Sequence, residues 1–276
     1  MRTVWLVVVA AVLLSPLAAS ADEAATRYHK AMAYKRAGKI DEAIRELKAA
    51  IGARADYAAA HFSLGILYRQ RKQTNEAISH LERAAKLEPK AAQTQYSLGL
   101  AYQQAGREDD AIKTLTIAAT LAPKDDQVQN ALGTMLIRKD PKKAIPYLLA
   151  AVNAKPNDAG YLQRLGLAYR KANDNKRAEQ YLLKSRELKE DASTEFDLGV
   201  LYRRMNKQDK AIEHYEAAIR LDPKLAAAYW DVAHMYAQKK RDEDAAAAYE
   251  KYLKVTGGKT ADADIARKRI KEHRKK

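Results

Sequence analysis

The chain has 276 residues, of which 47% are hydrophobic and 31% charged, and its formal net charge is +15. This apolar content excludes wholesale disorder. Cysteine is absent, which excludes disulfides, thiolate chemistry and cysteine-based zinc sites. Only 11 residues are glycine and 7 are proline, so we expect helix almost everywhere.

The first residues differ in composition from the rest of the chain. Arg2 precedes an apolar run from Val4 to Leu14, and the small residues Ala19-Ser20-Ala21 follow. This layout is typical of a secretory signal peptide, residues 1–21, with cleavage after Ala21. We therefore expect an extracytoplasmic protein, periplasmic or secreted. The alternative is an N-terminal membrane anchor that stays attached, but the run is shorter than the ~20 apolar residues that a bilayer span needs.

A Leu-Gly-x-x-Tyr motif or a close variant recurs with a period of about 34 residues. Its copies begin at Leu64, Leu98, Leu132, Leu165 and Leu198, and the related sequences AMAY at Ala31 and AHMY at Ala233 extend the series. Alanine follows at one phase of every unit: Ala43, Ala77, Ala111, Ala144, Ala178, Ala211 and Ala245. Prolines then close four units: Pro89, Pro123, Pro156 and Pro223. Leucine, glycine and tyrosine at this spacing form one helical stripe, and alanine marks a second helix.

The motif glycines lie inside predicted helices. Each costs about 1 kcal/mol of helix propensity relative to alanine, so we expect a close helix–helix contact as the compensation. One helical pair cannot bury both of its faces, whereas a stack of pairs can.

This pattern resembles the tetratricopeptide repeat (TPR), a 34-residue helix-turn-helix unit. The resemblance implies an all-α, TPR-like alpha-solenoid, a right-handed superhelix of helix-turn-helix repeats, with a C-terminal capping helix. Seven repeats are expected within residues 22–257, at about 24–57, 58–91, 92–125, 126–158, 159–191, 192–225 and 226–257. Residues 258–276 predict the basic capping helix and tail, with Ile265 and Ile270 as its apolar points. The early Trp of the family pattern is replaced, which predicts looser packing, by Arg27, His61, Gln95, Gln129, Leu162, Glu195 and Tyr229.

Neighbouring carboxylates do not indicate catalysis in this sequence. Asp41-Glu42, Asp109-Asp110 and Glu243-Asp244 fall in the first turn of a predicted second helix, where negative charge complements the helix dipole. The six histidines occupy different phases of different units, and metal-protease, nucleophile-elbow and phosphate-loop motifs are absent. We predict no enzyme, no catalytic residue, no cofactor and no metal.

In the TPR family the first helices line a concave surface, and the resemblance places two rows of residues there, with a row of basic residues beside them. The first row is Tyr28, Phe62, Tyr96, Asn130, Gln163, Phe196 and Trp230. The second row is Met32, Ile66, Leu100, Thr134, Leu167, Val200 and His234. The basic row is Lys35, Arg36, Arg69, Arg138, Arg170, Lys171, Arg203 and Arg204. The candidate partner-binding residues are Tyr28, Phe62, Ile66, Arg69, Tyr96, Leu100, Arg170, Phe196, Arg203 and Trp230.

These rows suit a protein or peptide with hydrophobic anchors and acidic groups, because aromatic and arginine side chains often dominate binding energy. The alternative is that the apolar residues widen the buried stripe and the arginines solvate its rim. The family's clamp for a terminal carboxylate has only a partial match, at Asn130. We thus predict an exported scaffold for protein–protein interaction, within an envelope assembly, secretion or adhesion complex.

The positive charge supports a second candidate, a cationic surface protein that binds anionic lipid or an envelope polymer. Residues 259–276 contain eight Lys or Arg and three Asp or Glu, so peripheral membrane contact through the C-terminus is one form of it. Phosphate neutralisation drives nucleic-acid binding in many basic proteins. Export argues against nucleic acid here.

Overall fold

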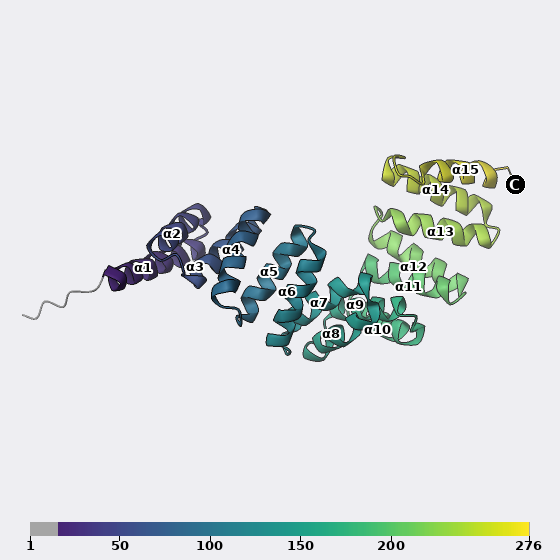
Figure 1. The fold of residues 1–276 in the computed structure, drawn as a ribbon. Coiled ribbons are helices and arrows are strands. Elements are labelled where there is room, and N and C mark those ends of the chain that lie inside the picture. Colours follow the sequence, from purple (N-terminus) through teal and green to yellow (C-terminus); the bar gives the residue numbers. More distant parts are fainter. Residues whose placement is uncertain (1–15, 276) are drawn as a thin grey trace, which may run out of the picture. The chain divides into compact units, whose positions relative to one another are not determined.

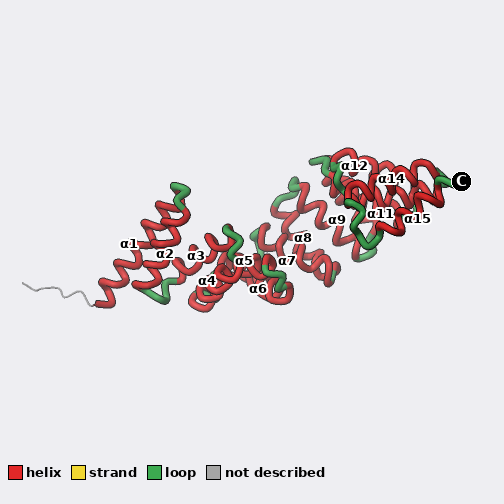
Figure 2. The backbone as a smooth tube through the Cα atoms, turned by 90° about the horizontal axis from the view of Figure 1, so that it is seen from above, coloured by secondary structure: helices red, strands yellow, loops and turns green. Residues whose placement is uncertain are grey.

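The computed structural model describes residues 16–275. These residues form fifteen α-helices joined by short loops and contain no β-strand (Figure 2). The all-α fold predicted from the sequence is therefore confirmed. Most of the predicted signal peptide lies outside the described residues, and α1 (Pro16–Arg36) runs through the cleavage position predicted after Ala21. Within residues 16–275, no helix is both long enough and apolar enough to cross a membrane.

The helices divide into two compact units, unit 1 up to Ala122 and unit 2 from Pro123. Within each unit consecutive helices pack in pairs, and each pair packs on the next (Figure 1). We call the odd-numbered helix of a pair its first helix and the even-numbered one its second helix. The pairs of unit 1 are α1 with α2 (Ile40–Ala53), α3 (Ala58–Gln70) with α4 (Thr74–Leu87), and α5 (Ala92–Gln104) with α6 (Glu108–Leu121).

Unit 2 contains four pairs and one further helix. The pairs are α7 (Asp126–Lys139) with α8 (Pro141–Ala154), α9 (Ala159–Lys171) with α10 (Asn175–Leu188), α11 (Ala192–Arg204) with α12 (Gln208–Leu221), and α13 (Ala226–Gln238) with α14 (Asp242–Thr256). The further helix, α15 (Ala263–His273), packs on α14.

The motif glycines lie at close contacts between the two helices of a repeat. A Cβ atom on Gly65 would lie 2.6 Å from Cγ of Leu81, and one on Gly199 would lie 2.6 Å from ring carbons of Tyr215. The same contact joins Gly99 to Leu115, Gly133 to Leu148 and Gly166 to Leu182. The close helix–helix contact expected from the glycines is therefore confirmed.

The second helices begin and end where the sequence predicts. The carboxylate pairs lie in the first turns of α2, α6 and α14, and four second helices end two residues before the closing prolines. In α8 the N-cap Asp140 accepts a hydrogen bond from the backbone N–H of Lys143 at 3.1 Å, and Pro141 is the first helical residue. Proline suits this position because its missing N–H would have no partner there.

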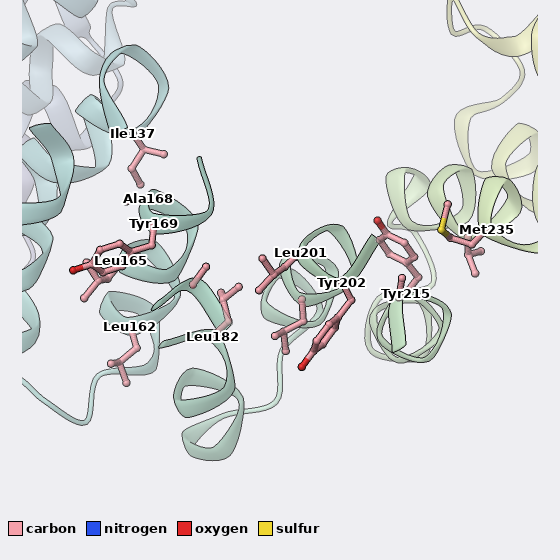
Figure 3. Packing of buried hydrophobic residues seen from close by; sticks show 14 of the residues in the cluster. Ile137, Leu162, Leu165, Ala168, Tyr169, Leu182, Leu201, Tyr202, Tyr215 and Met235 are labelled. Atoms are coloured by element: carbon pink, nitrogen blue, oxygen red, sulfur yellow. The ribbon is translucent and has the colours of Figure 1, made fainter. Parts of the chain in front are cut away.

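Each unit has its own apolar core, made of side chains from the facing sides of its helices. In unit 1 the core cluster includes Leu47, Leu64 and Leu67, each with no exposed surface. In unit 2 one cluster extends from Ile137 to Ala266, and Figure 3 shows its leucine and tyrosine side chains lying between successive helices. Burial that continues from repeat to repeat is what a solenoid requires, because each repeat contacts only its neighbours.

The capping helix α15 is present, but its apolar contacts differ from the prediction. Ile270 packs against the core of unit 2, whereas Ile265 is 47% exposed. The buried residues of α15 are instead Ala263, Ala266 and His273. The His273 ring stacks on Tyr249 at a centroid distance of 6.4 Å, and its Nδ1 lies 2.5 Å from a carboxylate oxygen of Asp242. The prediction for Ile265 was wrong because this residue lies about 100° around the helix from the buried Ala266, on the exposed side of α15.

Candidate functional site

The first and second rows lie along the first helices of the repeats. All fourteen of their residues are half-buried, while the motif leucines beside them are fully buried or nearly so. In unit 1 the rows run over α1, α3 and α5, and in unit 2 over α7, α9, α11 and α13. Each unit therefore presents a partly covered strip of side chains, some of which, such as Tyr28 in unit 1 and Phe196 in unit 2, also pack against its core.

In unit 1 the strip is apolar, with an aromatic and an aliphatic residue on each first helix. The residues are Tyr28 with Met32 on α1, Phe62 with Ile66 on α3, and Tyr96 with Leu100 on α5. The Tyr28 ring contacts Tyr57 at a centroid distance of 5.3 Å. The basic row adds Lys35 and Arg69, both half-buried. Unit 1 thus brings together six of the ten candidate binding residues.

In unit 2 the strip is crossed by polar bonds between neighbouring first helices. Arg170 Nη2 on α9 donates to Oδ1 of Asp197 on α11 at 2.9 Å, and Gln163 Nε2 donates to Oδ2 of the same carboxylate at 2.6 Å. Arg203 Nη1 on α11 donates to Asp231 Oδ1 on α13 at 2.8 Å. Burial raises the pKa of Asp197, and the charge of Arg170 opposes that rise. The charges of both candidate arginines in unit 2 are therefore directed at carboxylates of the chain itself.

The two aromatic candidates of unit 2 rest on neighbouring rings. Trp230 lies 5.0 Å from the ring of Tyr252 and 5.6 Å, edge-on, from the ring of Tyr249. Phe196 lies 5.7 Å from the ring of Tyr215. Such tilted and edge-on pairs add packing energy and hold a ring in one orientation. A partner would meet Phe196 and Trp230 as fixed surfaces.

The prediction of looser packing at the early Trp position was wrong. Of the seven replacements, five are buried: His61, Gln95, Gln129, Leu162 and Glu195. Two of the polar ones bond to the second helix of their own repeat. Nδ1 of His61 lies 3.0 Å from Nδ1 of His80, and Oε2 of Glu195 lies 2.6 Å from Nδ1 of His214. Polar groups fit at this position because a hydrogen-bonding partner stands opposite.

The histidine phases were also misjudged. His80 and His214 occupy the same place in repeats 2 and 6, each 19 residues after the early Trp position. Sequence reasoning likewise missed Asp197 and Asp231, which share one phase in repeats 6 and 7. The signal was available, because each follows a basic-row arginine by 27 or 28 residues. Within residues 16–275, no group of three or more His, Cys, Asp or Glu residues is placed to hold a metal ion.

Comparison with known families accounts for this arrangement. A model described as TPR repeat matches residues 66–106 and 199–240, and two models described as tetratricopeptide repeat match residues 28–80 and residues 92–125, 159–191 and 226–257. Together these matches cover more than half of the sequence. The chain belongs to the tetratricopeptide repeat family.

Solved structures with the same fold include single proteins and a chain of a larger complex. A tetratricopeptide repeat protein from Parabacteroides merdae has a TM-score of 0.65 at 15% identity, covering 91% of this chain and 99% of its own. PilF from Pseudomonas aeruginosa has a TM-score of 0.62 at 18% identity, covering 80% of this chain and 99% of its own. A chain of the APC/C hetero-tetramer Cut9–Hcn1 has a TM-score of 0.63 at 18% identity and covers 94% of this chain, which spans only 48% of that longer one. At these identities the similarity concerns the fold alone. No curated protein matches the sequence significantly.

Proposed function

We propose that this chain is an exported, non-catalytic scaffold that holds a protein partner against the first helices of its repeats. The observation that carries the proposal is the half-burial of every residue in the first and second rows. A strip of partly covered aromatic and aliphatic side chains gains further buried apolar area when a partner covers it, at about 25 cal/mol per Å². Rings that are already held in place lose little conformational freedom on binding.

Export rests on the sequence of residues 1–21, with its single arginine, apolar run and small residues before the predicted cleavage position. An exported scaffold of this kind fits an envelope assembly, secretion or adhesion complex. An intact protein whose first residue is Asp22 is the expected product in the extracytoplasmic fraction. N-terminal sequencing that reads from Met1 would contradict export with release and favour the membrane-anchored alternative.

A second candidate function is binding of anionic lipid or polymer through the C-terminus. It is favoured by exposed basic side chains on and just after α15: Arg267, Lys268, Arg269, Lys271, Arg274 and Lys275. Some of this charge is compensated, because Arg267 pairs with Asp264 at 2.6 Å and Arg274 pairs with Glu250. Such binding would be electrostatic and would weaken steeply with salt.

Site-specific photo-crosslinking tests the scaffold function. A photoreactive amino acid replaces Phe62, Phe196 or Trp230 in turn, and the exposed Glu213 on α12 serves as the control position. We expect one discrete protein adduct from row positions and none from Glu213, and we expect it to persist in moderate salt. Equal adducts from all four positions would contradict a partner-binding face. Adducts lost in moderate salt, together with salt-sensitive binding to anionic vesicles, would favour the second candidate.

A further inference from the structure

One position of the repeat holds a basic-row residue in four repeats. An aspartate pairs with that residue in only two of them. The position is occupied by Lys35 and Arg69 in unit 1 and by Arg170 and Arg203 in unit 2. In unit 2 each arginine meets an aspartate from the first helix of the next repeat, 27 or 28 residues later in the sequence. These ion pairs cross the strip between α9 and α11 and between α11 and α13.

In unit 1 the positions of those aspartates hold Ser63 and Ser97, each 28 residues after the corresponding cation. The helices α3 and α5, which carry Arg69 and Ser97, are in contact. The Arg69 side chain is half-buried, forms no ion pair or hydrogen bond with any residue from 16 to 275, and has a buried Nε without a partner. The Nε of Arg170 is also unpartnered, but the Nη2 of that residue reaches Asp197. Arg69 has no such carboxylate.

The uncompensated cations lie beside apolar residues on the same helix faces. Phe62, Ile66 and Arg69 follow one another at spacings of four and three residues, which places them on one face of α3. Tyr28, Met32 and Lys35 repeat the arrangement on α1. Lys35, like Arg69, forms no ion pair among the residues that the structure describes. Two neighbouring first helices thus each present an aromatic residue, an aliphatic residue and an unpaired cation.

We infer that unit 1 takes an acidic amphipathic segment of a partner protein, whose carboxylates pair with Arg69 and Lys35 while its apolar side chains cover Phe62 and Ile66. This inference rests on the proposed function and names the chemistry of the partner. A half-buried guanidinium without a carboxylate gains strong charge-assisted hydrogen bonds when one is supplied. Arg170 and Arg203 gain little, because Asp197 and Asp231 already supply theirs. The carboxylates of the partner therefore select unit 1.

Labelled probe peptides test this chemistry on the purified protein. The first probe is a helical peptide of about four turns with Leu and Phe on one face and Glu beside them; the second has Gln in place of every Glu, and the third has Ser in place of every Leu and Phe. We expect the acidic amphipathic probe to bind at least about ten times more tightly than either of the others in fluorescence anisotropy. Equal affinity of the Gln probe would overturn the role of the carboxylates.

Variants that remove an arginine, or that add or remove the carboxylate opposite it, show which unit binds the acidic probe. Arg69→Gln and Ser97→Asp, which supplies the missing partner of Arg69, should each weaken the acidic probe about tenfold. The matched control Arg203→Gln should change its affinity less than about twofold, because Asp231 already neutralises Arg203. Asp231→Ser, which frees Arg203, should instead add binding of the acidic probe to unit 2. Circular dichroism confirms that each variant stays helical. A loss for Arg203→Gln as large as that for Arg69→Gln would overturn the assignment to unit 1.

The photo-crosslinking experiment separates failure of this inference from failure of the proposed function. A protein adduct from Phe62 that disappears in the Arg69→Gln background supports both. Adducts only from Phe196 and Trp230 would leave the scaffold function intact and overturn the assignment to unit 1. Absence of adducts from all three positions would overturn both.

Discussion

Repeat 2 in unit 1 and repeat 6 in unit 2 use the same two positions to join their helices. The first position holds an imidazole in repeat 2 and a carboxylate in repeat 6. In repeat 2, His61 faces His80, and burial lowers the pKa of both imidazoles, that of His80 to about 4. In repeat 6, Glu195 faces His214, so an acceptor carboxylate stands where repeat 2 has a second imidazole. In both repeats the second-helix histidine stacks on the motif tyrosine, Tyr68 or Tyr202. The repeat fixes the geometry of this contact and leaves its charge free to vary.

The largest effect should come from removing one member of the pair in repeat 6. Glu195 and His214 are 3% and 5% exposed, so Glu195→Ala leaves the imidazole buried without its acceptor and opens a cavity. We expect the free energy of unfolding to fall by about 3 kcal/mol, the scale for breaking a buried pair. Chemical denaturation with hydrogen exchange of α11 and α12 measures it.

The matched control replaces both residues together. Repeat 5 has Leu162 and Tyr181 at these two positions, and Leu162 is completely buried. The double variant Glu195→Leu with His214→Tyr should recover most of the loss, because no buried polar group then lacks a partner. A double variant as unstable as Glu195→Ala would show that the hydrogen bond, rather than satisfaction of buried groups, holds repeat 6 together.

Acid should weaken repeat 2. His61 Nε2 lies 3.2 Å from the carbonyl oxygen of Ala55, which can only accept, so neutral His61 carries its proton there and His80 Nδ1–H donates to His61 Nδ1. The unfolded chain binds protons near pH 6.5, whereas folded His80 binds one only near pH 4. The unfolded state therefore holds more protons between these values, and stability is lost as the pH falls through this window. The difference between these two pKa values corresponds to a loss of at most about 3 kcal/mol in the free energy of unfolding. Screening by solvent makes the loss smaller.

Hydrogen exchange of α3 and α4 between about pH 7 and pH 5, corrected for the intrinsic exchange rate, measures this loss. Lys48 and Arg83 lie near the two imidazoles and oppose their protonation, so high salt should reduce the effect. His80→Tyr, the residue that repeats 4 and 5 have at this position, is the matched variant and should flatten the pH profile of unit 1. An unchanged profile in that variant would contradict the assignment to His80.

The helix contacts of the two repeats should also differ in their tolerance of a methyl group. At Gly199 a Cβ would meet three ring carbons of Tyr215 within 3.0 Å, whereas at Gly65 it would meet the branched end of Leu81 and, at 3.2 Å, the backbone oxygen of Ala77. A ring yields less than a leucine side chain, so Gly199→Ala should cost about 1–3 kcal/mol, the range for overpacking, and Gly65→Ala should cost less. Thermal unfolding of the two variants checks the order. Equal losses would mean that backbone contacts, not the rings, set the cost.

The sequence predicts the repeat skeleton because the same constraint acts seven times. Gly65 and Gly199 signal a close contact, and Pro89 signals the end of a helix, through local geometry that does not depend on the rest of the chain. The polar pairs are different. Whether His61 meets His80 depends on which residues stand opposite each other on two helices, and a search for residues that recur from one repeat to the next does not pair different positions with each other. The ion pairs of Arg170 and Arg203 cross repeats and were missed for the same reason.

The smallest effect should come from the turn after the first helix. At this position Lys72 of repeat 2 has a φ of 60° and Asn206 of repeat 6 a φ of 57°, whereas repeats 1 and 3 have Gly38 and Gly106 there, each with a φ of 73°. A left-handed backbone costs lysine about 1 kcal/mol or more, while asparagine adopts it more readily. Lys72→Gly removes this cost, but glycine loses more conformational entropy on folding. The variant should therefore raise the free energy of unfolding by about 0.5 kcal/mol. Asn206→Gly should change it less, and an equal gain in both variants would show that this side-chain preference does not distinguish the two repeats.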